Sequence, residues 1–391
     1  MGGAQSRSNG VRILFLCGSL EPGRDGVGDY TARLAAELRS QGHDCLCAAI
    51  DDRFIEQDSV ENGLVRGPGF LRLSRKKSWA ARMEVLWKKV AEFHPDWVSL
   101  QFVPYGFHPK GMPFLLPGRL GSIRGEFNWH MMFHELWIDP RASWYAWVIS
   151  RLQRANISHL YRSTRPKMVH TSNKNYAHKL AAVGISASVL PLFSNIERAN
   201  SDPSLRKKIV RDICYQIDNR DAWIFIFFGT IHPGWDVDVF LNRISEVARK
   251  ANKKAVVLLS IGKNPCQESA PLSRLRKIKT GFLDFREIGE LRPAEISQYL
   301  QAADFGVATT PLRLLGKSGS AAAMASHGIP VVVPRADVRL DRAILDKKGI
   351  VPVDGFFEEK LLNPPKPRDL GSVEDVSRMF LKSLEPANPY R

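Results

Sequence analysis

The amino-acid sequence predicts two doubly wound α/β domains in tandem, each built on a parallel β-sheet. Short apolar runs alternate with amphipathic helical segments along most of the chain, and one polar, charged stretch at 192–220 interrupts this alternation. Apolar runs of this length are typical of strands that are buried on both faces of a parallel sheet. A length of 391 residues suits two domains, and 44% hydrophobic with 25% charged residues is an ordinary globular composition.

The first series of elements lies in the N-terminal half of the chain. The opening βαβ unit is expected from a strand at 11–17, a helix at 29–41 and a strand at 45–50, and such a unit makes the sheet parallel. A further helix is expected at 79–93, and the strands that complete this series are expected at 97–103, 128–134, 167–171 and 188–191. We expect one domain at 11–195, preceded by a disordered tail at 1–10.

The second series follows the polar stretch. It predicts strands at 223–228, 255–260, 282–288, 305–308 and 330–333, with helices between them at 236–251, 293–302 and 318–327. We expect these elements to form a second domain at 196–371. The amphipathic stretch 372–387 predicts a last helix, and the segment 372–391 is expected to pack back across a cleft between the two domains. Ligands bind at the carboxyl ends of strands in open α/β sheets, so the loops that follow these strands are the candidate sites.

Composition excludes several classes of protein. The 56 Lys and Arg residues against 40 Asp and Glu make the chain basic, with a net charge of +16, and no stretch approaches the about 18 consecutive apolar residues that a membrane-spanning helix needs. The N-terminus lacks the apolar core of a secretion signal, and a frayed tail explains Gly2 and Ser6 better than myristoylation does. The cysteines show no CxxC spacing, so we expect reduced thiols and a cytoplasmic location. They are Cys17, Cys45, Cys47, Cys214 and Cys266.

The loop before the first helix ends in two glycines, Gly26 and Gly28. Glycines at a helix N-terminus let backbone N–H groups approach a phosphate or a sugar closely. The dinucleotide pattern GxGxxG is incomplete, because 29–31 holds no third glycine, so a nicotinamide oxidoreductase is disfavoured. A plain tight turn explains this loop as well as a ligand loop does.

A second candidate loop is the run 317–320, Lys-Ser-Gly-Ser, directly before the helix expected at 318–327. An ammonium group beside the first amides of a helix suits a diphosphate, and Arg313 stands close enough in the sequence to add a second cation. We favour this interpretation over a serine N-cap beside a solvated lysine. The run is not a Walker A loop, because the order Gly-Lys-Ser/Thr is missing.

A histidine, His134, stands at the carboxyl end of the strand expected at 128–134. In that place it can hydrogen-bond a sugar hydroxyl or assist proton transfer, although a structural histidine is equally expected. His130 shares its pleat face, and His232 takes the analogous place in the second domain. The run 236–238 is formally a DxD pattern, but an aspartate directly before a helix is typical of an N-cap. We therefore predict no essential metal.

The segment 72–89 combines basic residues with tryptophans. Such a segment can adhere to an anionic lipid surface, which makes peripheral membrane contact at the inner face of the membrane one hypothesis. The better-supported explanation is a solvated helix face with one buried tryptophan stripe. No nucleic-acid-binding module is visible, so nucleic acid is not expected as a partner.

An ordered set of segments resembles the GT-B glycosyltransferases, specifically family 4, the glycogen-synthase-like retaining enzymes. In the first domain the segments are 26–43, His134-Glu135, 170–173 and 190–195. In the second domain they are 228–234, 289–304 and 323–332. Their order and spacing carry the resemblance, which implies two Rossmann-like domains that face one another across a cleft.

The chain departs from the family pattern where the donor is usually held. The family usually carries two glutamates spaced E-x7-E, one beside the sugar and one on the donor ribose, but Leu314 and Ala322 stand at those positions here. The Arg and Lys that typically bind the diphosphate are also absent after the first strand of the second domain. Lys317 and Arg313 are the candidate replacement cations.

The resemblance implies transfer of a sugar from a nucleotide-sugar donor to a carbohydrate, lipid or small-molecule acceptor, with retention and with no cofactor or metal. The missing carboxylates keep a second hypothesis open, a GT-B-shaped binding or partner subunit that has lost catalysis. The diphosphate is expected against 317–320 and the nucleobase near 289–291. The expected catalytic residues are His134 and Lys317, and the expected donor-binding residues are Gly26, Gly28, Gly229, Thr230, Gly289, Leu291, Arg313, Ser318, Gly319 and Ser320.

Overall fold

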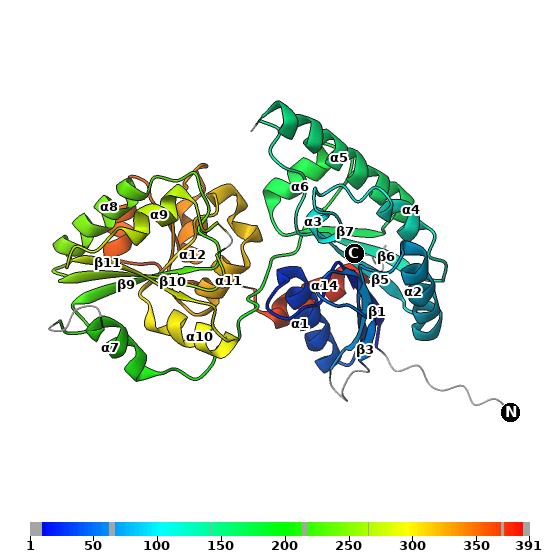
Figure 1. The fold of residues 1–391 in the computed structure, drawn as a ribbon, viewed down its shortest axis with the longest axis horizontal. Helices are drawn as coiled ribbons and strands as arrows, with labels where there is room; N and C mark the ends of the chain where they lie inside the picture. The colour runs from blue at the N-terminus through cyan, green and yellow to red at the C-terminus, as the bar shows by residue number, and fades with distance from the viewer. Residues whose placement is uncertain are drawn as a thin grey trace. The chain divides into compact units, whose positions relative to one another are not determined.

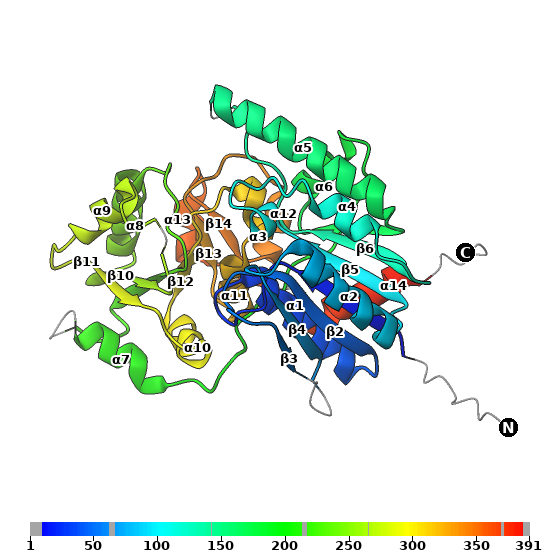
Figure 2. The ribbon, with the colours of Figure 1, turned by 45° about the vertical axis from the view of Figure 1, so that its right-hand side comes forward.

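The computed structural model describes residues 10–61, 67–141, 143–212, 217–264, 266–368 and 371–385. The chain divides into two compact units (Figures 1 and 2). Unit 1 runs to Pro191 and includes the chain from Val373 onward, and unit 2 is Leu192–Ser372. The division falls four residues before the boundary expected at 195/196. Residues 1–9 of the expected tail lie outside the described residues.

Unit 1 contains an eight-stranded sheet in its described residues, in the order β3-β4-β2-β1-β5-β6-β7-β8. Every neighbouring pair is parallel except β3–β4, which is antiparallel. The strands are β1 (Arg12–Cys17), β2 (Asp44–Asp52), β3 (Ser59–Glu61), β4 (Gly69–Ser74), β5 (Trp97–Phe102), β6 (Asn128–Phe133), β7 (Met168–Thr171) and β8 (Ser188–Val189).

Helices cover this sheet. They are α1 (Gly26–Ser40), α2 (Trp79–Phe93), α3 (Pro104–Phe107), α4 (Leu116–Gly121), α5 (Trp144–Thr164), α6 (Lys174–Ala181) and α14 (Val373–Leu384). Side-chain N-caps fix the starts of four of them: Asp25 for α1, Ser78 for α2, Ser143 for α5 and Asn173 for α6.

The helix α14 belongs to unit 1 although it follows the whole of unit 2 in the sequence. It lies beside α1 (Figure 1). Its Phe380 is completely buried. The centroid of the Phe380 ring lies 5.9 Å from that of Phe15 in β1 and 5.0 Å from that of His130 in β6. The last helix of the chain therefore completes the core of the N-terminal unit.

Unit 2 contains a six-stranded parallel sheet in its described residues, in the order β11-β10-β9-β12-β13-β14. The strands are β9 (Ala222–Phe228), β10 (Ala255–Ile261), β11 (Leu283–Gly289), β12 (Phe305–Val307), β13 (Val331–Val333) and β14 (Ile350–Pro352). The helices are α7 (Pro203–Arg211), α8 (Val237–Lys250), α9 (Ala270–Arg276), α10 (Pro293–Ala302), α11 (Gly319–Ser326), α12 (Arg342–Lys347) and α13 (Phe357–Leu362), with a 3₁₀ helix at Leu312–Lys317.

The central strand β9 shows why this sheet needs helices on both faces. Ile224 and Ile226 point to one face and join the core beneath α10 and α11, whereas Phe225 and Phe227 point to the other and join the core beneath α8 and α9. Alternate residues of a strand face opposite sides of its sheet, so a strand that is apolar throughout is buried on both.

The alternation of strands and helices predicted from the sequence is confirmed in both units. Cys17, Cys45 and Cys47 are buried free thiols, while Cys214 lies outside the described residues. The sequence analysis missed the strands β3, β4 and β14 and several helices, of which α5 is the longest. No helix in the described parts of the chain is long and apolar enough to cross a membrane.

Candidate functional site

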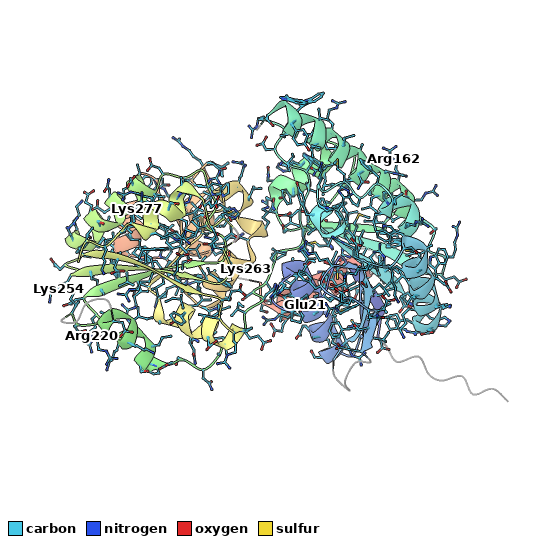
Figure 3. All side chains as sticks on the ribbon, in the orientation of Figure 1. Glu21, Arg162, Arg220, Lys254, Lys263 and Lys277 are labelled. Atoms are coloured by element: carbon cyan, nitrogen blue, oxygen red, sulfur yellow. The ribbon has the colours of Figure 1, made fainter. Side chains whose placement is uncertain are left out.

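Basic residues follow the four central strands of unit 2, at the carboxyl edge of its sheet. His232 follows β9, Lys263 follows β10 (Figure 3), Arg313 and Lys317 follow β12, and Arg335 follows β13. Ligands of open α/β sheets bind at this edge. We call four of these side chains, Lys263, Arg313, Lys317 and Arg335, the cationic edge of unit 2.

Arg335 was missed by the sequence analysis. Its guanidinium is half-buried and donates to the carbonyl oxygen of Pro233, at 3.3 Å, in the loop that follows β9. The ideal Cβ position of the adjacent Gly234 is 3.9 Å from Arg335 Nη2. The loop after β9 contains no Arg or Lys of its own, and Arg335 brings a positive charge to it. A basic residue just after the strand expected at 330–333 was the signal available.

Two arginines of this edge lie near one another, Arg313 and Arg335. Burial lowers the pKa of Arg335 below its ordinary value, and the nearby charge of Arg313 lowers it further. Arg313 is itself ion-paired with Asp337, and its backbone N–H donates to the same carboxylate at 3.1 Å. The structure thus gives Arg313 an acidic partner within the unit, which reduces the charge that it can offer to a ligand.

The helix α11 begins where the sequence analysis expected a diphosphate. Ser318 is its N-cap, because the Ser318 hydroxyl accepts from the backbone N–H of Ala321 at 3.2 Å and lies 3.1 Å from Ser320 Oγ. The N-cap interpretation is therefore confirmed for this side chain. Gly319 and Ser320 open the first turn, in which the leading amides of a helix have no partner within the helix. Lys317 is half-buried at the end of the preceding 3₁₀ helix.

Hydrogen bonds hold the loop after β9 in place. Thr309 Oγ1, in the loop after β12, accepts from the backbone N–H of His232 at 2.9 Å and donates to the carbonyl of Thr230 at 3.3 Å. The indole of Trp235 donates to the carbonyl of His232 at 2.9 Å. Gly229 has a φ of +79°, which a residue with a side chain rarely adopts, so a glycine is needed at this strand end.

The residues expected near a nucleobase lie at the edge strand of the same sheet. Gly289 ends β11 with a φ of +85°, and its carbonyl accepts from the backbone N–H of Gly262 at 2.7 Å. Leu291 is partly buried against the core beneath α10. The structure therefore brings the expected donor residues of unit 2 to one edge, with Gly289 and Leu291 two strands away from Gly229 and Thr230.

The DxD pattern serves α8. Asp236 accepts from the backbone N–H of Val239 at 2.9 Å, which confirms the predicted N-cap, and Asp238 is ion-paired with Arg274 at 2.7 Å. In the residues that the structure describes, no three His, Cys, Asp or Glu side chains gather closely enough to hold a metal ion.

His134 is buried at the end of β6 in unit 1. Its Nε2 donates to Gln101 Oε1 at 2.9 Å, and its ring meets the ring of Tyr30 edge-on, with centroids 4.9 Å apart. Burial lowers the pKa of His134 to about 3, so the ring is neutral at physiological pH. With Nε2 committed to Gln101, Nδ1 is the atom left to accept from a hydroxyl. Contact with the transferred sugar stays a prediction.

The same face of the sheet carries a chain of hydrogen bonds. The Gln101 amide donates to Ser99 Oγ at 2.8 Å, Ser99 lies 2.8 Å from Nδ1 of His130, and His130 Nε2 lies 3.0 Å from Nδ1 of His170. A consistent direction of donation runs from Gln101 through Ser99 and His130 to His170. Burial lowers the pKa of each of the three histidines, so the chain is held together by neutral rings.

Gly26 and Gly28, expected in a ligand loop, form the first turn of α1. Asp25 Oδ1 accepts from the backbone N–H groups of Val27 and Gly28, both at 3.0 Å. A Cβ at Gly28 would lie 2.5 Å from the carbonyl oxygen of Ser19, so this glycine permits close packing against the loop after β1. Two of the amides expected to meet a ligand are therefore bonded to the side chain of Asp25.

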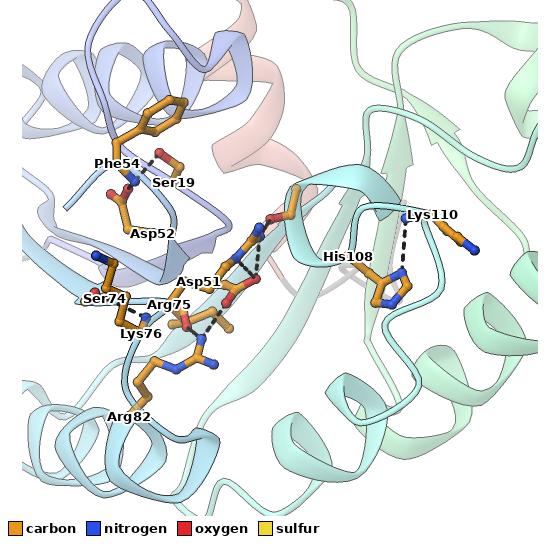
Figure 4. A network of polar contacts seen from close by, with 12 residues as sticks. Ser19, Asp51, Asp52, Phe54, Ser74, Arg75, Lys76, Arg82, His108 and Lys110 are labelled. Carbon is orange, nitrogen blue, oxygen red and sulfur yellow. Dashed lines mark hydrogen bonds and ion pairs between the residues drawn. The ribbon is translucent and has the colours of Figure 1, made fainter. Parts of the chain in front are cut away.

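The basic segment 72–89 is neutralised from within unit 1. Asp52, which is completely buried, accepts from Arg72 Nε at 2.8 Å. Asp51 accepts from Arg75 and Arg82, each at 2.6 Å (Figure 4). The four lysines pair with acidic side chains as well: Lys76 with Glu56, Lys77 with Asp58, Lys88 with Glu84 and Lys89 with Glu92. This arrangement supports the solvated helix face rather than the membrane hypothesis for this segment. The expected buried tryptophan stripe is wrong, because Trp87 is 44% exposed.

No family model and no curated protein sequence matches the chain, but solved structures match almost all of it. A Listeria monocytogenes protein provisionally described as a UDP-N-acetylglucosamine 2-epimerase is 12% identical, with a TM-score of 0.56 over 96% of each chain. Sucrose-phosphate synthase from Thermosynechococcus elongatus is 12% identical, with a TM-score of 0.56 over 95% of this chain and 94% of that one. The catalytic domain of starch synthase IV from Arabidopsis thaliana, bound to ADP and acarbose, is 11% identical, with a TM-score of 0.54 over 97% and 93%.

At these identities the likeness shows the fold. The chain has the two Rossmann-like domains of the GT-B fold, each with its own parallel sheet, as the sequence predicted.

Proposed function

We propose that the chain is a glycosyltransferase that moves a sugar from a nucleoside-diphosphate donor to an acceptor. The cationic edge of unit 2 carries this proposal. Lys317 directly precedes the N-cap of α11, and Arg335 reaches the loop after β9, so both stand at the strand ends where α/β sheets bind ligands. Fixed positive charges of this kind stabilise the negative charge that develops on a departing diphosphate.

The names of the structural neighbours point to the same class of donor. One is named for UDP-N-acetylglucosamine, and the starch synthase domain was solved with ADP. We infer that this chain also binds a nucleoside diphosphate. Its diphosphate would lie against Lys317, Ser318, Gly319 and Ser320.

Retention and family 4 membership are part of the proposal and rest on the sequence resemblance. Leu314 and Ala322 stand where that family usually has two glutamates, so donor contacts in this chain differ from the family pattern. The proposed mechanism uses side-chain cations at the diphosphate and requires no metal. A carbohydrate, a lipid or a small molecule is the proposed acceptor.

The test compares free nucleotides with the complete reaction. Calorimetric titration with UDP, GDP and ADP should find one that binds, and hydrolysis or transfer from the corresponding sugar donors should follow. Lys317→Ala should lower both affinity and turnover, whereas Lys277→Ala removes a charge of the same kind directly after α9 and should change neither (Figure 3). Binding without turnover of any donor would favour the non-catalytic partner subunit, and failure of all three nucleotides to bind would refute the transferase.

A further inference from the structure

The first half of α5 exposes aromatic and apolar side chains. Trp144 is 80% exposed, Trp147 52%, Tyr145 51% and Leu152 40%. Val148 lies between them on the same exposed surface. We call these five residues the α5 patch. Two further exposed apolar side chains, Phe114 and Leu115, directly precede α4, which packs beside α5.

The patch is not a by-product of core packing. The buried residues of α5 recur with helical spacing on the opposite side, and among them are Ala146, Ile149, Gln153, Ile157 and Leu160. The solvent side of such a helix ordinarily carries charged and polar residues. Here its first turns carry two tryptophans and a tyrosine, and contiguous exposed apolar surface marks an interaction site.

The stretch of chain that contains the patch carries charge of one sign. From 140 to 196 the sequence contains no Asp or Glu but eight Lys and Arg residues. Three of these lie on α5: Arg151, Arg154 and Arg162, the last labelled in Figure 3. The guanidinium of Arg151 lies 4.9 Å from the ring centre of Trp147, so charge and aromatic surface are interleaved. The nearest preceding acid, Asp139, is ion-paired with Arg141 at 2.7 Å.

We propose that the α5 patch binds the surface of an anionic lipid bilayer. Tryptophan and tyrosine partition to the headgroup level of membranes, and arginines beside them attract anionic lipids. A neutral or cationic partner would leave the positive charge uncompensated, and so the charge selects an anionic surface. The binding is peripheral, since in the described part of the chain no helix can span a bilayer. This inference concerns unit 1 alone and does not depend on the proposed activity.

The test is sedimentation of the full chain with vesicles of phosphatidylcholine, with and without phosphatidylglycerol. The chain should bind the anionic vesicles more tightly than the neutral ones, and added salt should weaken the binding because it screens the arginines. The double variant Trp144→Ala/Trp147→Ala should bind anionic vesicles about tenfold or more weakly, because each tryptophan loses its burial at the interface.

Trp87→Ala is the matched control. Trp87 is also an exposed tryptophan, but it lies on α2, where the neighbouring lysines are ion-paired. The variant Trp87→Ala should bind anionic vesicles as tightly as the unchanged chain does. Equal weakening by Trp87→Ala, or no preference for anionic vesicles, would overturn the proposal. Light scattering gives a further test. If the unchanged chain is a dimer and Trp144→Ala/Trp147→Ala is a monomer, the proposal is overturned, because the patch would then bind a second copy of the chain. Titration of the double variant with nucleotides tests the proposed diphosphate site of unit 2 separately from vesicle binding.

Discussion

Arg335 donates a hydrogen bond to the carbonyl oxygen of Pro233, at 3.3 Å, across 102 positions of the sequence. The two residues meet because β9 and β13 flank β12 and all three strands run parallel, so that the loops after β9 and β13 emerge at the same edge of the sheet. The loop that lacks its own Arg or Lys thus receives a guanidinium from a later part of the chain.

Arg335→Ala should therefore weaken binding of the nucleoside diphosphate that the chain accepts. A hydrogen bond to a charged group contributes about 1.5–3 kcal/mol, which corresponds to about 10- to 100-fold in affinity. Calorimetric titration measures the change. Arg335→Lys should retain part of the affinity, since the charge remains, whereas Lys277→Ala should retain all of it. Unchanged affinity in Arg335→Ala would remove this residue from the proposed diphosphate site.

Gly26 and Gly28 offer a matched pair of substitutions at the start of α1. Gly28→Ala should destabilise unit 1 by about 1–3 kcal/mol, because the new methyl group would lie 2.5 Å from the carbonyl oxygen of Ser19. Gly26→Ala should be neutral or stabilise by up to about 1 kcal/mol, since no heavy atom lies within 4 Å of its Cβ position. Urea unfolding of both variants measures the difference. Equal effects would mean that packing against Ser19 does not explain Gly28.

The buried histidine chain predicts acid sensitivity. The pKa of His134 falls to about 3 and that of His170 to about 4, while that of His130 falls well below the ordinary 6.5; burial is the main cause in each case. Below pH 6.5 the unfolded chain binds more protons than the folded chain, so stability is complete above that pH and declines as the pH falls. The slope is about 1.4 kcal/mol per pH unit for each histidine that titrates only on unfolding.

Urea unfolding between pH 7 and pH 5 measures this slope above the range in which most carboxylates titrate. His130→Gln/His170→Gln should flatten the slope, and His159→Gln, which changes an exposed histidine of α5, should leave it unchanged. A stability that does not vary over this range would show that the histidines are not the acid-sensitive element.

The helix α14 should be essential for the stability of unit 1. Phe380 is completely buried against Phe15 and His130, so Phe380→Ala should cost about 3–5 kcal/mol of unfolding free energy. Its neighbour Met379 is 46% exposed, and Met379→Ala should change stability by less than about 0.5 kcal/mol. Calorimetric melting of the two variants distinguishes these outcomes, and a small effect of Phe380→Ala would contradict the role of α14 in this core.

Local patterns were enough to predict most of the strands, the N-cap at Asp236 and the placing of Lys317 at a helix start. These features depend on residues that are near one another in the sequence: apolar periodicity, a capping side chain three residues before the amide that it meets, and a loop after a strand. The same repeated alternation predicted two doubly wound α/β domains, whereas the GT-B fold was implied by the resemblance of an ordered set of segments to that class of enzymes.

The pairings that define the candidate site lie beyond such patterns. Strand order brings together loops that are separated in the sequence: Arg335 meets Pro233 across 102 positions, and Arg313 pairs with Asp337 across 24. The directions in which side chains point bring the cations of 72–89 to acidic partners and leave Trp144 exposed to solvent. A sequence shows which charges and rings a chain has, but distance and burial determine which charges cancel and which surfaces stay open, and both arise only when distant segments pack.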